Sequence, residues 1–153
     1  MAVQGSTLFF GVVESTNIFE GVRQMKEIII IAGENKFDIE RLRDCLREEG
    51  YNSTACEMAE EIIEELDIMP ICSVHVPLVV IEPAILKDIS DDLVERLSEC
   101  APDVPFTLLA GVNLEGDLAE KFEQICAHRE QFKPESNRLT NVLKEAGVAV
   151  TCG

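Results

Sequence analysis

Short apolar runs alternate with amphipathic segments along most of the chain. Residues 28–31 are all isoleucine, and this run predicts a strand over 27–33 that is buried on both faces. A less apolar run predicts an edge strand over 51–56, and further apolar runs predict strands over 77–82, 104–110 and 148–152. The chain therefore offers five candidate strands.

Helical spacing fills the segments between these strands. Apolar side chains recur at steps of three and four residues over 38–49, 58–66, 89–100 and 136–146. Strands that alternate with helices predict an α/β fold: a doubly wound, flavodoxin-like, five-stranded parallel sheet with helices on both faces. Such sheets bind ligands at the carboxyl ends of their strands. The residues expected at those ends are Gly33, Glu34, Glu82, Pro83, Ala110 and Gly111.

The region from 27 to 111 contains three stretches with a recognisable order: IIIIAGENKFDIERLRDCLREEGY, VPLVVIEPAIL and DVPFTLLAG. The first resembles the opening strand and first helix of the receiver domains of two-component response regulators. The second resembles their third strand with the phosphoacceptor loop, and the third resembles their fourth strand with its switch hydroxyl. The resemblance implies a receiver-like domain over 27–153, preceded by an extension over 1–26 that has room for a strand and a short helix.

The same resemblance places the family's phosphorylation residues on this sequence, and most of them are changed. The acidic pair that holds Mg²⁺ in a working receiver falls on Gly33 and Glu34, so one carboxylate is missing. The phosphoacceptor aspartate falls on Glu82, whose extra methylene displaces its oxygens, and the switch hydroxyl falls on Ala110. Phosphoryl transfer needs positioned charge around the transferred group. The resemblance therefore implies a pseudo-receiver, with a degenerate phosphorylation pocket and no catalytic residue.

Two interpretations are open for the family's lysine. Lys133-Pro134 repeats the family's Lys-Pro pair at nearly the right distance, which requires a fifth strand at about 128–132. That segment, HREQF, is very polar for a buried parallel strand. The spacing of apolar residues over 118–132, a stripe that includes Arg129, favours a helix broken by Pro134 instead. The fifth strand is then 148–152, and Lys133 lies in a loop.

Composition and charge narrow the classes of partner. The 153 residues fit one domain with its own core, and 13 basic against 29 acidic residues give a formal net charge of −16. Nucleic acids and anionic membranes both require a cationic surface, so we expect neither as a partner. Residues 1–22 contain no basic residue for a signal peptide, and no apolar stretch is long enough to span a membrane. We expect a cytoplasmic protein.

The six cysteines have wide, irregular spacings and form no CxxC pair. The nearest metal-like spacing is Cys72-x-x-His75, and His128 is the other histidine, which is too few ligands for a zinc site. We therefore expect buried free thiols, no disulfide framework, no metal site and no cofactor.

We expect the apolar residues in the N-terminal extension to be buried. Burial of a large apolar side chain contributes about 1.5–3 kcal/mol of free energy relative to leaving it in water. The extension contains five such side chains: Leu8, Phe9, Phe10, Ile18 and Phe19. Two-fold dimers are the commonest closed assemblies, and these residues predict a homodimer contact. Alternatively, residues 8–13 add a strand to the chain's own sheet.

Three functional hypotheses follow from these features. The first is a non-catalytic receiver-like signalling domain that acts by protein–protein interaction, with a sensor kinase or an output protein as its partner. The second is a ligand-binding or enzymatic flavodoxin-like domain. It has no Gly-rich phosphate loop, although Glu34 and Glu82 could pair to bind a cation. The third is a receiver that is phosphorylated at an atypical site.

Overall fold

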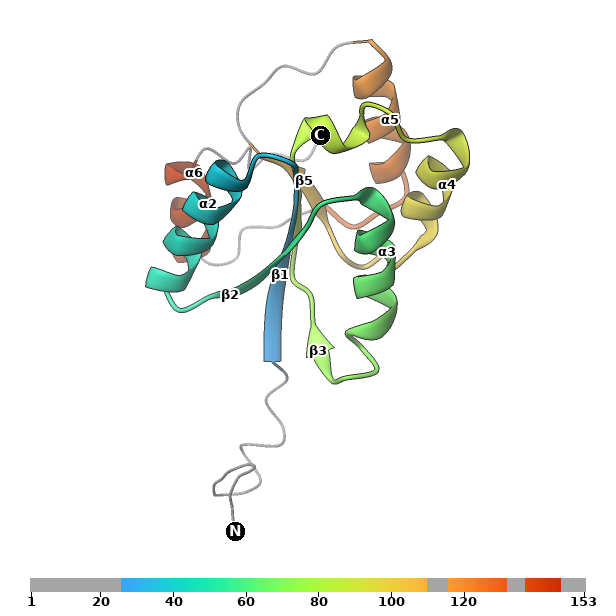
Figure 1. Ribbon diagram of the computed structural model, residues 1–153. Helices are drawn as coiled ribbons and strands as arrows, with labels where there is room; N and C mark the ends of the chain where they lie inside the picture. Colours follow the sequence, from blue (N-terminus) through green and yellow to red (C-terminus); the bar gives the residue numbers. More distant parts are fainter. Residues whose placement is uncertain (1–25, 110–115, 132–136, 147–153) are drawn as a thin grey trace.

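Parallel strands with helices on both sides make up the described part of the computed structural model, which covers residues 26–109, 116–131 and 137–146 (Figure 1). The strands are β1 (Lys26–Ala32), β2 (Asn52–Cys56), β3 (Val74–His75), β4 (Val79–Ile81) and β5 (Phe106–Leu108). The helices are α2 (Lys36–Glu48), α3 (Ala59–Ile68), the 3-10 helix η2 (Pro83–Leu86), α4 (Asp91–Glu99), α5 (Asp117–Cys126) and α6 (Asn137–Glu145).

The strand order β2-β1-β4-β5 makes β1 the centre of the sheet, and every neighbour pairs in parallel. The chain builds outward from β1 to β2 on one side and to β4 and β5 on the other. The order therefore reverses between β1 and β4, where ligands bind in doubly wound folds. Ala32 pairs with Ile81 at this point, so the next residues of the two strands, Gly33 and Glu82, are neighbours. The predicted fold class is confirmed.

Side chains of β1 alternate between two cores because successive residues of a strand point to opposite faces. Ile29 and Ile31 join a core with residues of α2 and α6, whereas Ile30 and Ala32 join a core with residues of α3, α4 and α5. Figure 1 shows the same division, with α2 and α6 on one face of the sheet and α3, α4 and α5 on the opposite face. The run of four isoleucines thus fills both faces of the central strand, as expected for a strand covered on both sides.

The short strand β3 is a feature that the hydrophobic pattern did not predict. Glu27 of β1 pairs with His75, and Ile30 pairs with Val79. Three steps along β1 therefore match four steps along the partner segment, which indicates a bulge around Pro77, a residue that cannot donate to a ladder. With β3, which pairs with β1, the described sheet has five strands. The strand predicted over 148–152 lies outside the described residues.

The helix predicted over 118–132 forms, but it ends earlier than expected. α5 stops at Cys126, and residues 127–131 are turns and irregular chain. The alternative strand at 128–132 is therefore wrong over 128–131, whereas α6 confirms the helix predicted over 136–146. Lys133 lies outside the described residues. None of the helices within the described ranges is long and apolar enough to cross a membrane.

The cysteines are free thiols where the structure describes them, but the expectation of uniform burial was wrong. Cys56 is buried, Cys72 is exposed, and Cys45, Cys100 and Cys126 are half-buried. Cys72 lies in an exposed turn after α3, so its side chain does not contribute to the core. Burial, followed by the negative charges of nearby glutamates, raises the pKa of Cys56 to about 12, so this thiol stays protonated at neutral pH.

Candidate functional site

The carboxyl ends of β1 and β4 form the centre of the candidate site. The backbone N–H of Glu82 donates to Ala32 O at 2.8 Å, which extends the ladder by one residue. The Glu82 side chain then crosses to the turn between β1 and α2. There its Oε1 accepts hydrogen bonds from the backbone N–H of Glu34 at 2.7 Å and of Asn35 at 3.2 Å. Glu82 therefore ties the β4 end to the start of α2.

Gly33 lies directly beneath this side chain. A β-carbon at position 33 would lie 2.9 Å from Glu82 Cβ, 3.0 Å from Ile39 Cδ1 and 3.2 Å from Glu82 Oε1. The first distance is shorter than real β-carbon contacts, the other two are tighter than most of them, and Glu82 Cβ is fixed to its own strand. The glycine is thus required by the close approach of a neighbouring side chain. Gly33 and Glu82 fit one another as a pair.

The Glu82 carboxylate also adds to the cap of α2. The Asn35 side chain accepts from the backbone N–H of Asp38 at 3.2 Å, which is an ordinary N-cap hydrogen bond. The amides of Glu34 and Asn35 lie just before this helix, and Glu82 satisfies both. A carboxylate at this place also complements the positive end of the helix dipole, which contributes about 0.3–1 kcal/mol at exposed sites.

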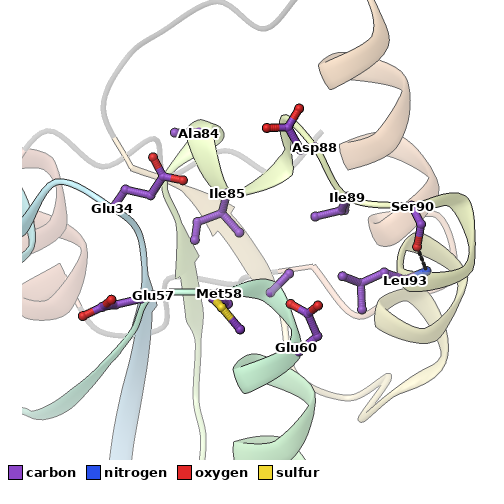
Figure 2. A pocket seen from close by; sticks show the side chains of 11 residues that line it. Glu34, Glu57, Met58, Glu60, Ala84, Ile85, Asp88, Ile89, Ser90 and Leu93 are labelled. Atoms are coloured by element: carbon purple, nitrogen blue, oxygen red, sulfur yellow. Dashed lines mark hydrogen bonds between the residues drawn. The ribbon is translucent and has the colours of Figure 1, made fainter.

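The residues at this edge do not fit the Mg²⁺ site that a receiver-like fold implies. Mg²⁺ requires oxygen ligands in near-octahedral geometry. Gly33 offers no side-chain oxygen, and Glu82 Oε1 already accepts from two amides. Glu34 is exposed, and its side chain lines a neighbouring pocket in Figure 2. Within the described ranges, no group of three or more His, Cys, Asp or Glu side chains is placed to hold a metal ion.

The structure brings together only part of the predicted set of site residues. Gly33, Glu34 and Glu82 meet at the switch point, and Pro83 opens η2 immediately after Glu82. Ala110 and Gly111 lie outside the described residues, as Lys133 does. The last described residue of that strand end, Leu109, donates from its backbone N–H to Ile81 O at 2.8 Å.

A pocket of about 360 Å³ lies beside this edge, where the starts of α3, η2 and α4 converge (Figure 2). We name it the acidic pocket. Its walls include four carboxylates and a set of apolar side chains. The lining residues used below are Glu34, Glu57, Glu60, Asp88, Met58, Ile85, Ile89 and Leu93. Sequence patterns did not predict this pocket, because its residues come from three connections far apart along the chain.

Arg129 is a second residue whose role the sequence analysis missed. Its side chain is buried and stacks on the Phe106 ring, with the guanidinium carbon 3.9 Å from the ring centroid. Its terminal nitrogens donate to the main-chain carbonyls of Leu97 (2.6 Å), Ala101 (2.6 Å), Val104 (2.7 Å) and Cys100. Burial lowers the pKa of Arg129. This contact joins the end of α5 to the end of α4 and the turn after it. The sequence feature that could have indicated this role is the position of Arg129 within the otherwise apolar stripe over 118–132.

Comparison with known proteins identifies the fold. No protein-family model and no curated protein sequence matches the chain. The signal receiver domain of an HD domain-containing protein from Pseudomonas fluorescens Pf-5 superimposes with a TM-score of 0.53 and 20% identity, over 79% of this chain and 94% of that chain. A response regulator receiver protein from Pseudomonas putida gives a TM-score of 0.51 and 13% identity, over 80% and 98%. A receiver domain protein from Methanospirillum hungatei JF-1 gives 0.50 and 15%, over 80% and 97%.

Identities this low show shared architecture and leave the function of the chain to its own residues. The described part of the chain has the flavodoxin-like fold of response-regulator receiver domains.

Proposed function

We propose that this chain is a non-catalytic receiver-like signalling domain that acts through protein–protein contacts and has a degraded phosphorylation pocket. The observation that carries the proposal is the position of the Glu82 side chain. Its carboxylate crosses over Gly33 and accepts from the amides of Glu34 and Asn35. The residue at the phosphoacceptor position is thereby used to hold a turn.

The chemistry of phosphoryl transfer supports this proposal. The acceptor oxygen must lie in line with the leaving group, and cations must neutralise the charge on the transferred oxygens. Gly33 supplies no metal ligand, and the close contact with Glu82 leaves no room for one to be added. A domain with this arrangement would transmit information by the surfaces that it presents to a partner, without a cofactor. The partner we propose is a sensor kinase or an output protein of the cytoplasm.

The absence of phosphorylation is directly testable. We expect no added phosphoryl mass when the protein is incubated with acetyl phosphate and Mg²⁺ and then analysed by intact mass spectrometry. A receiver domain with an intact phosphorylation pocket, treated in parallel, is the positive control. A stoichiometric adduct that maps to Glu82 or to a nearby aspartate would refute this proposal and support a receiver with an atypical phosphorylation site.

We further propose that the chain forms a homodimer through the apolar residues of its N-terminal extension. The repulsion of two chains with charge −16 is screened beyond about 8 Å at physiological ionic strength, so an apolar contact can outweigh it. Sedimentation should show a dimer for the full chain at tens of micromolar. A variant that starts at Met25, and so retains all of β1, should be monomeric. A monomeric full chain would disprove the dimer, and a dimer of the shorter variant would place the contact elsewhere.

A further inference from the structure

The floor of the acidic pocket is apolar. Ile85 and Leu93 are each 6% exposed and close its base, and Ile89 is half-buried beside them. Met58 stands at the mouth with 53% of its surface exposed, although it is a large apolar side chain (Figure 2). Methionine is flexible and polarisable, and it is common on surfaces that adapt to a bound partner. The pocket therefore offers a place for a hydrocarbon chain.

The rim of the pocket carries only negative charge. Glu34, Glu57, Glu60 and Asp88 are all exposed, and the pocket lining includes no basic residue. Among the ion pairs of the described residues, one involves this rim: Lys36 Nζ lies 3.9 Å from Glu57 Oε2, with both side chains exposed. The other three rim carboxylates are exposed and take part in none of these ion pairs. The rim is thus complementary to a cation.

Two helices begin at this pocket, and a side chain of the protein already caps the start of each. At the start of α3, Glu61 Oε1 accepts from the backbone N–H of Glu57 at 2.7 Å and of Met58 at 3.1 Å. At the start of α4, Ser90 Oγ accepts from the backbone N–H of Leu93 at 3.1 Å. Side-chain caps thus already partner some of the amides that could attract phosphate to these helix N-termini. Four rim carboxylates also repel an anion.

We infer that the acidic pocket receives a lysine or arginine side chain of a partner protein. This side chain combines an alkyl stem, which would pack on Met58 and Ile89, with a cationic head that would reach the carboxylates of the rim. The inference rests on the proposed function, because a receiver-like domain that works by contact must present a surface to its partner. It adds the chemistry of that partner: a basic segment that projects one cationic side chain into the pocket.

The test is a nuclear magnetic resonance titration of the full chain with a single-arginine probe. The probe is the capped tripeptide acetyl-Ala-Arg-Ala-amide, and its matched control contains citrulline, which has the same shape without the charge. We expect amide shifts confined to Glu34 and to residues 57–60 and 84–93 with the arginine peptide, and at least fivefold weaker binding of the citrulline peptide. Equal binding of the two peptides, or shifts spread over the whole acidic surface, would overturn the inference.

Variants separate a specific pocket from general acidity. E60Q/D88N removes two rim charges and should weaken binding of the arginine peptide at least fivefold. E48Q/E123Q removes two exposed charges outside the pocket lining and should change it less than twofold. M58A should weaken binding about threefold at unchanged charge. Equal losses for the two double variants would contradict the inference. All these readouts are independent of the phosphorylation assay, so either proposal can fail alone.

Discussion

Replacing Arg129 with methionine should lower the free energy of unfolding by about 3–5 kcal/mol, because several hydrogen bonds from a charged group are lost and each contributes about 1.5–3 kcal/mol. Methionine fills much of the same volume but donates no hydrogen bond. Four main-chain carbonyls would lose the guanidinium as a donor. Ala101 O would still accept from the backbone N–H of Val104, and Leu97 O from the Cys100 thiol, whereas an unsatisfied buried polar group costs about 1–3 kcal/mol. The stacking contact with Phe106 would also be lost.

The turn that Arg129 holds has little stability of its own. Ala101 lies in the left-handed region at φ 41°, which costs a residue with a β-carbon about 1–2 kcal/mol. The guanidinium contact with Ala101 O offsets this strain. Domains of this size are stable by about 5–15 kcal/mol, so loss of the contact should remove a large share of the total.

Urea unfolding followed by circular dichroism measures this effect. R96M is the matched control, because Arg96 lies exposed on α4, and it should change the free energy of unfolding by no more than about 0.5 kcal/mol. R129K should give an intermediate loss, since lysine keeps the charge but not the planar fork that reaches several carbonyls. If R129M were as stable as R96M, the structural role assigned to Arg129 would be wrong.

The elements that could be predicted are those whose pattern is local. The isoleucine run and the helical spacing of α2, α3, α4 and α6 each depend on residues within one segment. Burial of alternate side chains on two faces then determines a parallel, doubly wound sheet. The bulge between β3 and β4 escaped prediction, because Pro77 interrupts a pairing that can be recognised only against β1.

The candidate site was predictable in position but not in geometry. Parallel strand ends place Gly33 beside Glu82, as expected from the topology. The resemblance suggested that Glu82 is too long for an acceptor, but it could not show that the extra length reaches two amides on the neighbouring turn. The role of Arg129 depends on carbonyls about 25–32 residues earlier in the chain, which no local spacing reveals.

Gly33→Ala should destabilise the protein by about 1–3 kcal/mol, the usual cost of inserting a methyl group into a filled site. The new β-carbon would lie 2.9 Å from Glu82 Cβ, so one of two hydrogen-bonded strands must shift. G33D, which returns the family's acidic residue, adds a carboxylate beside that of Glu82 and should cost more. We therefore expect that this single reversion restores no Mg²⁺ binding.

A double-mutant cycle tests whether Gly33 and Glu82 act as a pair. E82G removes the opposing β-carbon and the carboxylate, so G33A should cost at least about 1 kcal/mol less in that background than in the parent chain. G116A is the control: Gly116 has φ 61° and nothing within 4 Å of an added β-carbon, so its cost comes from its backbone alone. That cost should be the same with and without Glu82. Equal costs for G33A in both backgrounds would show that the close approach of Glu82 does not require the glycine, and the coupling proposed for this edge of the sheet would fail.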